Sequence, residues 1–180
     1  MRIIAGKFRR RIIHTIEGLD TRPVMDRIKE SIFNILVHRY SIVDSTVLDL
    51  FAGSGAFGLE ALSRGAKQVT FVEKSNEAVK FLNENINSLK CSEDCVVKNT
   101  SVEFFLEKNT QIYNFIFCDP PFKMEEPLSI LKIIAGRSLM DKDSLLIFRS
   151  EGKNKFTFPD FEVVLEKTFG RNIVYFLRKL

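Results

Sequence analysis

The chain has no tryptophan, and among its 180 residues there are only three cysteines and two histidines. A small, odd number of cysteines excludes the paired disulfide framework of a secreted domain, and reduced thiols are the default in the cytoplasm. Cys91 and Cys95 are spaced like metal ligands, but no histidine or second cysteine pair lies near them in the sequence, so we expect no metal. No apolar run approaches the roughly 18–20 residues of a membrane span, and the basic start lacks the apolar stretch of a secretory signal. We therefore expect a cytoplasmic protein with no membrane partner.

Excess charge is absent from most of the chain and concentrated at its start. The formal net charge is +4. Residues 1–40 hold nine basic and four acidic residues, a net charge of +5, which leaves −1 for residues 41–180. Hydrophobic residues make up 45% and charged residues 28%, as in an ordinary globular domain. The confined basic excess points to a polyanionic partner at that end.

From residue 46 onward, strand-like and helix-like patterns alternate. Apolar, β-branched runs predict strands at residues 47–51, 68–73, 95–98, 113–118 and 145–149. Helical spacing predicts helices at 56–64, after a Ser75 cap, at 101–108 and at 125–137, and residues 161–168 and 172–177 predict an antiparallel hairpin. Alternation of this kind indicates a parallel sheet with right-handed crossovers. The fold class is therefore α/β: a Rossmann-like, mixed, seven-stranded sheet with helices on both faces.

The first forty residues precede this alternating region and predict a different unit. Residues 2–5 and 10–16 predict two short strands of a β-hairpin that turns around residues 6–9. Residues 24–40 carry Ile28, Ile32 and Leu36 at helical spacing. We therefore divide the chain into a basic hairpin-and-helix extension, residues 1–40, and a larger domain, residues 41–180.

A glycine-rich turn follows the first strand of the alternating region. Gly53-Ser54-Gly55-Ala56-Phe57-Gly58 fits G-x-G-x-x-G and opens a helix. Glycines there allow a tight turn and close approach of a ligand to the free N–H groups at the helix start. Glu73 ends the next strand, 20 residues after Gly53, where a carboxylate can accept hydrogen bonds from ribose hydroxyls. This placement favours a nucleotide-type cofactor over a plain turn that needs small residues.

Asp49 bears on the choice of cofactor, since NAD enzymes share the glycine motif. It lies four residues before Gly53 in Asp49-Leu50-Phe51-Ala52-Gly53. A carboxylate there repels an anionic pyrophosphate and favours a ligand with positive charge, such as the ammonium and sulfonium of S-adenosylmethionine. The alternative is that Asp49 caps the turn, because aspartate is a common turn residue.

The tetrapeptide Asp119-Pro120-Pro121-Phe122 directly follows a strand that is apolar throughout. In open α/β sheets ligands bind outside the carboxyl ends of the strands, so we expect the tetrapeptide to face the glycine turn. Hydrogen bonds from an exocyclic amine to Asp119 and to the Pro120 carbonyl would localise the nitrogen lone pair and aim it at a methyl group. Two prolines stiffen the loop and remove backbone donors, and Phe122 offers a face for stacking an extruded base. The alternative is a simple strand-ending turn.

Several segments together resemble one family. They are residues 2–6, Arg22-Pro23, Asp26-Arg27, residues 33–36, residues 49–65 and residues 119–122. In these segments the chain resembles the bacterial small-subunit ribosomal RNA guanine-N2 methyltransferases (RsmD type), which have the class I S-adenosylmethionine-dependent methyltransferase fold. The resemblance implies transfer of one methyl group to the exocyclic N2 of a guanine in 16S rRNA, by a methyltransferase domain at residues 41–180.

The resemblance also implies roles for individual positions. The cofactor S-adenosylmethionine would contact Asp49, Phe51, Gly53, Gly55, Glu73, Thr100 and Ser101. Asp49, Gly53 and Gly55 would line its methionine end and Glu73 its ribose. Thr100 and Ser101 would border the adenine. The stretch from Asn99 to Ser101 lacks the carboxylate often found there, so that contact falls to the backbone or to Ser101.

The resemblance also implies which partner the basic extension, residues 1–40, would bind. Confined to one appendage of a base-modifying enzyme, its charges favour contact with RNA phosphates over a merely solvated face. The residues expected to bind RNA are Arg2, Lys7, Arg9, Arg10, Arg11, Arg22 and Arg27. The expected partner is 16S rRNA, the small ribosomal subunit or its assembly intermediate, and we expect the protein to be a monomer.

Three other functions share part of this pattern. An NAD-dependent oxidoreductase would share the glycine turn and Glu73 but has no use for the tetrapeptide. A non-catalytic RNA-binding domain would share the basic extension without needing a cofactor turn. An adenine-N6 methyltransferase acting on DNA or RNA shares the amine chemistry, and only residues 1–40 and 56–65 argue against it.

Overall fold

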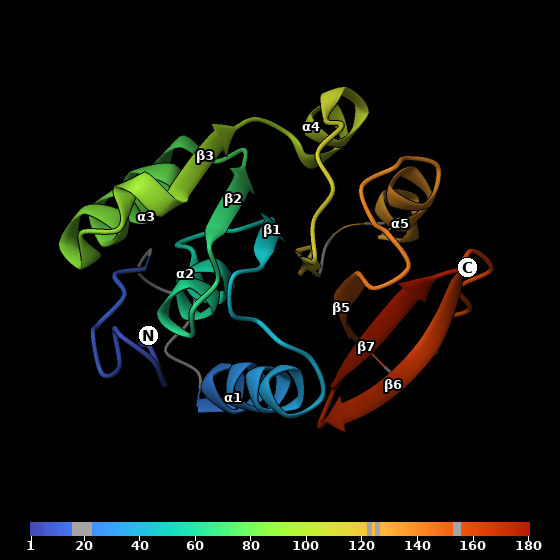
Figure 1. Cartoon of the computed structure of the whole chain (residues 1–180), viewed down its shortest axis with the longest axis horizontal. Helices are drawn as coiled ribbons and strands as arrows, with labels where there is room; N and C mark the ends of the chain where they lie inside the picture. The colour runs from blue at the N-terminus through green and yellow to red at the C-terminus, as the bar shows by residue number, and fades with distance from the viewer. Residues whose placement is uncertain (16–22, 122–123, 125–126, 153–155) are drawn as a thin grey trace.

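A computed structural model describes residues 1–15, 23–121, 124, 127–152 and 156–180. Within them the chain forms a seven-stranded sheet with helices on both faces (Figure 1). The strands are β1 Thr46–Leu50, β2 Gln68–Glu73, β3 Cys95–Asn99, β4 Phe115–Cys118, β5 Leu145–Glu151, β6 Phe161–Phe169 and β7 Asn172–Lys179. The helices are α1 Pro23–Arg39, α2 Ala56–Ser63, α3 Asn76–Leu89, α4 Val102–Lys108 and α5 Leu128–Ala135, with a short 3₁₀ turn at Ser92–Asp94. The predicted fold class is confirmed.

The strand order is β3-β2-β1-β4-β5-β7-β6. Strands β1 to β5 are parallel, and β7 is antiparallel to both β5 and β6. The chain therefore runs outward from β1 to β3, returns to β4 on the other side of β1, and closes with a hairpin whose last strand lies inside the sheet. None of the helices in the described part of the chain has the length and hydrophobicity needed to span a lipid bilayer.

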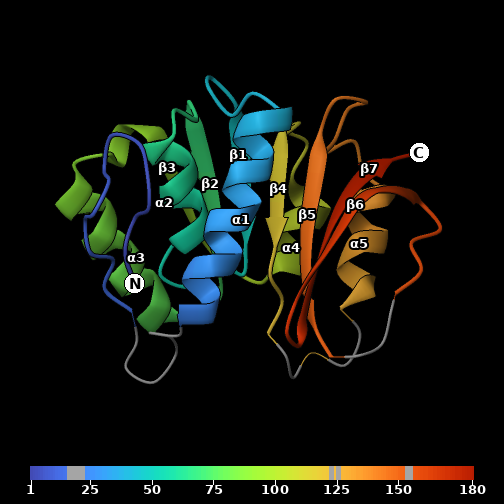
Figure 2. The ribbon, with the colours of Figure 1, turned by 90° about the horizontal axis from the view of Figure 1, so that it is seen from below.

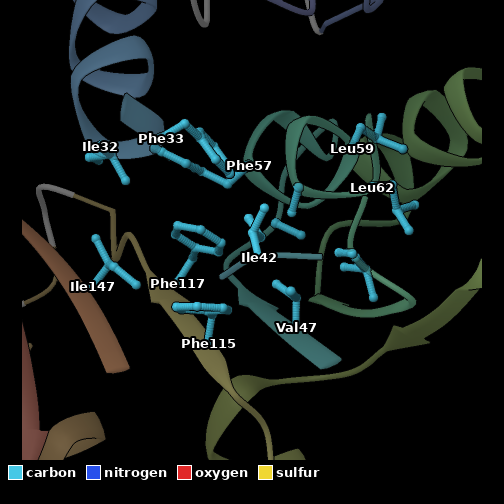
Figure 3. Close-up of a cluster of buried hydrophobic side chains, with 14 of the residues drawn as sticks. Ile32, Phe33, Ile42, Val47, Phe57, Leu59, Leu62, Phe115, Phe117 and Ile147 are labelled. Atoms are coloured by element: carbon cyan, nitrogen blue, oxygen red, sulfur yellow. The ribbon is translucent and has the colours of Figure 1, made fainter. Parts of the chain in front are cut away.

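Two apolar clusters cover the two faces of the sheet, and β4 contributes to both because its side chains alternate. Phe115 and Phe117 belong to the cluster that includes residues of α1 and α2, whereas Ile116 and Cys118 belong to the cluster that includes residues of α4 and α5. Helices α1 and α2 lie on one side of the sheet and α4 and α5 on the other (Figure 2). In the first cluster the Phe117 ring lies 5.3 Å from that of Phe57 and 5.4 Å from that of Phe33 (Figure 3). Both faces of the central parallel strands β1, β4 and β5 are therefore buried, which explains their apolar runs.

Several predicted elements differ in length from the observed ones. Helix α5 is Leu128–Ala135 rather than 125–137, and residues 125 and 126 lie outside the described residues. Near the amino terminus the chain doubles back as expected, but the two predicted strands reduce to one antiparallel bridge between Arg2 and Ile12. The reason is a competing partner. The backbone N–H groups of Ile4 and Ala5 donate to the carboxylate of Glu60, so they do not extend a strand ladder.

Glu60 is the centre of a buried polar cluster that holds the first residues against α1 and α2. It has no solvent exposure. Its Oε2 accepts from Ile4 N at 2.8 Å and lies 3.7 Å from Lys29 Nζ. Its Oε1 accepts from Ala5 N at 3.1 Å and from Arg64 Nε at 2.8 Å. Lys29, itself buried, donates to the Arg2 carbonyl at 2.8 Å. The basic extension is thus fastened to the sheet domain through its backbone.

Candidate functional site

The five parallel strands, β1 to β5, end at one edge of the sheet, the lower edge in Figure 2, where the chain leaves β4 and β5. Leu50 at the end of β1 pairs with Val72 of β2 and with Cys118 of β4. The glycine turn after β1 and the tetrapeptide after β4 therefore leave the sheet side by side. The chain order reverses between β1 and β4, and α/β proteins bind ligands at such a reversal, outside the carboxyl ends of the strands.

Between the end of β1 and the start of α2, residues 51–55 have left-handed backbone at three positions. The φ angles are +58° at Phe51, +54° at Gly53 and +87° at Gly55. A Cβ added at Gly53 would meet no atom within 4 Å, whereas one at Gly55 would lie 2.5 Å from a methyl carbon of Leu82. Gly55 is therefore required by packing, and Gly53 opens onto free space beside the start of α2. A ligand can approach the backbone there, which fits the predicted cofactor turn.

Asp49 lies in β1 and is 1% exposed. Its Oδ2 accepts from the backbone N–H of Gly58 at 2.8 Å. The N-cap residue of α2, Gly55, offers no side-chain cap, so Asp49 satisfies a donor in the first turn from the neighbouring strand. Burial raises the pKa of Asp49 well above its ordinary value, and the charges of Asp119 and Glu73 act in the same direction, although the Gly58 N–H opposes them. Asp49 thus has the capping role that the sequence left open, and its contact with a cofactor stays a prediction.

The Glu73 carboxylate accepts hydrogen bonds from the turn after β1 and from the turn after β2, both in the predicted cofactor site. Its Oε2 accepts from Gly53 N at 2.9 Å and its Oε1 accepts from Ser75 N at 2.8 Å. Asn99, next to it in β3, donates to the Glu73 carbonyl at 3.0 Å. The carboxylate is half-buried at the sheet edge. This is the position at which the sequence predicts a ribose contact, and the two amide donors hold the carboxylate there.

Thr100 and Ser101 follow β3 at the same edge and are partly exposed. The Ser101 hydroxyl accepts from Phe104 N at 3.2 Å and so caps α4. Sequence reasoning assigned these residues to the adenine, a role that stays a prediction. Their position, one strand beyond Glu73, is the expected one.

Asp119 follows β4 directly, and its side chain is 17% exposed. Arg149 of β5 approaches it with a two-pronged contact: Nε donates to Oδ1 at 2.6 Å and Nη2 donates to Oδ2 at 2.9 Å. The remaining prong, Nη1, donates to Oδ1 of Asn172 in β7 at 2.8 Å. The acceptor predicted for the target amine is therefore held in a fixed orientation by two neighbouring strands.

Arg149 and Asn172 were not identified from the sequence. One feature of the sequence does point to Arg149. Arg149 interrupts an apolar strand that is buried on both faces, and a charge in such a place needs a partner. The identity of the partner depends on strand order, which the sequence pattern does not specify.

The prolines of the tetrapeptide differ in exposure. Pro120 is buried and Pro121 exposed, and the Pro121 carbonyl accepts from Met124 N at 2.9 Å. Phe122, the predicted stacking residue, lies outside the described residues.

Asn85 of α3 is a third residue that the sequence did not reveal. It is 1% exposed. Its Oδ1 accepts from His14 N at 2.8 Å, and its Nδ2 donates to the carbonyls of His14 and Ser54 at 2.9 and 3.0 Å. Asn85 thereby connects the amino-terminal segment to the glycine turn.

The basic residues predicted to bind RNA fall in separate places. The Lys7 ammonium lies 3.6 Å from the Asp94 carboxylate, and Arg11 donates to the Ser88 carbonyl at 2.9 Å. Ser88 and Asp94 flank the connection from α3 to β3, at the edge of the sheet opposite the glycine turn. Lys7 and Arg11 therefore lie at the opposite edge of the sheet from Asp119. The other members of the predicted set are Arg2, Arg9, Arg10 and Arg27, which are exposed, and Arg22, which lies outside the described residues.

A groove of about 510 Å³ runs between α1 and β6. Arg27, Arg39 and Lys167 line it, together with the acidic Glu30 and the ring of Phe169. Among the described residues of the predicted RNA-binding set, only Arg27 lines this groove.

The sheet order and the two turns at the β1/β4 edge define a class I methyltransferase fold. A solved structure with the name "Putative methyltransferase yhhF from Escherichia coli" superimposes with a TM-score of 0.85 at 33% identity, covering 99% of this chain and 97% of that chain. The family model described as Conserved hypothetical protein 95 matches residues 1–178, and the chain belongs to this family, the RsmD type.

Two curated relatives carry the name "Ribosomal RNA small subunit methyltransferase D". The one from Haemophilus influenzae is 34% identical over 174 residues, which cover 94% of this chain and 89% of that protein. The one from Escherichia coli K12 is 36% identical over 157 residues, 86% of this chain and 76% of that protein. The resemblance stated from the sequence is thereby confirmed.

Proposed function

We propose that this protein transfers a methyl group from S-adenosylmethionine to the exocyclic N2 amine of a guanine in 16S ribosomal RNA. One observation carries the proposal: Asp119 and the glycine turn leave adjacent strands, β4 and β1, at the same edge of the sheet. Family membership and the names of the relatives support the substrate, and a ribosomal RNA substrate implies work in the cytoplasm.

The residues at the β1, β2 and β3 ends suit the proposed cofactor. Gly53 leaves open space at the start of α2, and the half-buried Glu73 places a carboxylate beside it. We assign the methionine end of the cofactor to Asp49, Gly53 and Gly55, its ribose to Glu73, and its adenine to Thr100 and Ser101. Phe51 is assigned to the cofactor site as a whole. When bound, the cofactor supplies a methyl group on a sulfonium, whose C–S electron pair stays on sulfur as the new N–C bond forms.

The chain's own residues align the amine. An exocyclic amine is a weak nucleophile because its lone pair is delocalised into the ring. Hydrogen bonds from the amine to Asp119 and to the Pro120 carbonyl localise that lone pair and direct it, while one amine proton leaves to solvent. Phe122 is assigned to stack on the extruded base. The rate enhancement is chiefly positional, with no covalent enzyme intermediate.

The basic extension is assigned to RNA binding. The exposed Arg9 and Arg10 and the neighbouring Arg11 form one site at the far edge of the sheet domain, and Arg27 lines the groove between α1 and β6. Two separated basic sites suit a large, folded RNA, because both can contact phosphates while one base reaches the catalytic edge.

The activity is tested by tritium transfer from S-adenosylmethionine to small ribosomal subunits and to naked 16S rRNA, followed by nucleoside analysis. We expect N2-methylguanosine. Detection of N6-methyladenosine instead would contradict the guanine-N2 proposal and would identify the protein as an adenine-N6 methyltransferase. Calorimetric titration with S-adenosylmethionine and with NAD tests the cofactor separately, and binding of NAD alone would overturn the methyltransferase assignment.

A further inference from the structure

The groove between α1 and β6 carries positive charge that the protein does not use internally. Its α1 wall is a polar stripe at helical spacing, made of Arg27, Ser31, Asn34 and His38, with Arg39 at the end of the helix. Lys167 and Phe169 of β6 form the opposite wall. Within the residues that the structure describes, no ion pair or side-chain hydrogen bond engages Arg27, Arg39 or Lys167. These charges are therefore available to a partner.

The charge is spread along the groove rather than gathered at one point. Arg27 and Arg39 are more than three helical turns apart, about 18 Å along the axis of α1. A compact anion would contact only one of them, whereas an extended polyanion can contact both. Glu30 is the one acidic side chain among the described lining residues, so the groove has an excess of positive charge. An RNA strand fits this pattern better than a single phosphate.

One end of the groove lies at the catalytic edge of the sheet. Strand β6 ends at Phe169, which pairs with Asn172 at the start of β7. The Asn172 side chain contacts Arg149, which in turn holds Asp119. Figure 2 shows that α1 begins, and the β6–β7 hairpin turns, at the lower edge, where β4 and β5 end. A strand that leaves the target nucleotide at this edge therefore enters the groove directly.

The Phe169 ring gives the groove a surface for a base. It is half-buried and packs against the first apolar cluster, which holds it in place at the groove. A ring held in this way can stack on any base, because every base has a π-face. The Ser31 hydroxyl and the Asn34 amide on the α1 wall can hydrogen-bond to sugar or phosphate. Cations along a groove combined with an aromatic ring are typical of single-strand binding.

Building on the guanine-N2 activity proposed above, we propose that this groove binds the single-stranded RNA segment that adjoins the target nucleotide. Arg27, Arg39 and Lys167 contact its phosphates, and Phe169 stacks on one of its bases. A single strand is the expected occupant because proteins that modify or read RNA bases act on loops, bulges and extruded nucleotides. The RNA-binding surface thereby extends beyond residues 1–40 to the carboxyl-terminal hairpin.

The first experiment removes charge from the groove without reversing it. Arg39→Gln/Lys167→Gln is compared with Lys80→Gln/Lys142→Gln, which removes the same charge from exposed positions outside the groove. Binding of naked 16S rRNA is measured over a series of salt concentrations. The groove variant should bind more weakly, and its slope of log affinity against log salt concentration should fall by about 1.4, or about 0.7 for each single-strand phosphate. The control should keep the slope of the unaltered protein.

Phe169→Leu tests the stack separately from the charges. Loss of one stacked base should weaken binding of 16S rRNA by at least about fivefold. The salt slope should be unchanged, because no charge is removed. Phe104→Leu is the matched control, since Phe104 is exposed on α4 and does not line the groove. The Kd for S-adenosylmethionine should be unchanged in every variant, which shows that the sheet domain is folded.

Ultraviolet crosslinking of the unaltered protein to small ribosomal subunits, followed by mass spectrometry, identifies the occupant. We expect a peptide that contains Phe169 to carry RNA nucleotides, and Phe169→Leu to lose this adduct. Absence of the adduct while RNA crosslinks elsewhere on the protein would overturn the proposal. A chemical crosslink from Lys167 to an acidic segment of a ribosomal protein, with no RNA adduct, would overturn it in favour of a protein partner.

The outcomes separate this inference from the proposed function. If the unaltered protein makes no N2-methylguanosine, the proposed function fails. If it does, and both groove variants bind 16S rRNA like the unaltered protein, the groove inference alone fails.

Discussion

Replacing Glu60 by alanine should release the first residues of the chain from the sheet domain. Four donors lose their acceptor at once: the N–H groups of Ile4 and Ala5, the Arg64 guanidinium and the Lys29 ammonium. Lys29 is 2% exposed, so its charge stays buried without a counter-charge at Glu60. Removing one partner of a buried pair typically costs about 3–5 kcal/mol. For a chain of this size that lowers the melting temperature by roughly 6–20 °C.

Urea denaturation measures the loss, and amide hydrogen exchange at Ile4 and Ala5 locates it. Glu84→Ala, on the exposed side of α3, is the matched control and should change stability by less than about 0.5 kcal/mol. Lys29→Met should be milder than Glu60→Ala. Burial already lowers the pKa of Lys29, and Glu60 keeps its other three donors in that variant. A loss below about 1 kcal/mol in Glu60→Ala, with both amides still protected, would refute the reasoning.

Three further changes test other parts of the molecule. Burial raises the pKa of Asp49 well above 3.8, so stability should fall as pH rises above about 3.8 and until the folded-state pKa of Asp49 is passed. Asp49→Asn should lessen that fall when urea midpoints are measured over a pH series, and a fall of unchanged size would be the contrary result. Asp119→Ala should reduce methyl transfer by about 10²–10³-fold with the Kd for S-adenosylmethionine nearly unchanged, and normal turnover would contradict the proposed amine contact. Replacing the three arginines of the amino-terminal segment by glutamate should weaken RNA binding; they are Arg9, Arg10 and Arg11. The slope of log affinity against log salt concentration should fall by about 0.7–0.9 for each phosphate that is no longer neutralised. The same replacement at three exposed lysines elsewhere, Lys80, Lys132 and Lys142, should leave affinity and slope unchanged, and equal effects of the two triple variants would contradict the assigned RNA site.

The sheet domain could be predicted from the sequence because its signals are local. An apolar strand, a glycine turn and a following helix lie within 20 residues of each other, and the parallel arrangement follows from their repetition. The placement of the glycine turn beside the tetrapeptide followed from the same repetition. The strands near the amino terminus could not be predicted in the same way. Whether Ile4 and Ala5 pair with a strand or with Glu60 depends on a residue more than 50 positions away.

The contacts of Asp119 also could not be predicted from the sequence, because its partners are far away along the chain. Its partner Arg149 is 30 residues away, and Asn172 lies 23 residues beyond that. Their contact depends on β7 lying next to β5, and nothing in the periodicity of either strand specifies that neighbour. Asp49 is a different case, since the sequence left a cap and a cofactor contact open and the structure shows the cap.

The position of β7 between β5 and β6 has a consequence for the order in which the protein is made. The glycine turn and Glu73 belong to the first half of the chain, and Asp119 is synthesised soon after them. Asn172, which braces Arg149, is among the last nine residues. A growing chain therefore contains the glycine turn long before Asp119 has both of its supporting residues. The support of Asp119 by Arg149 and Asn172 is therefore completed only when β7 enters the sheet beside β5.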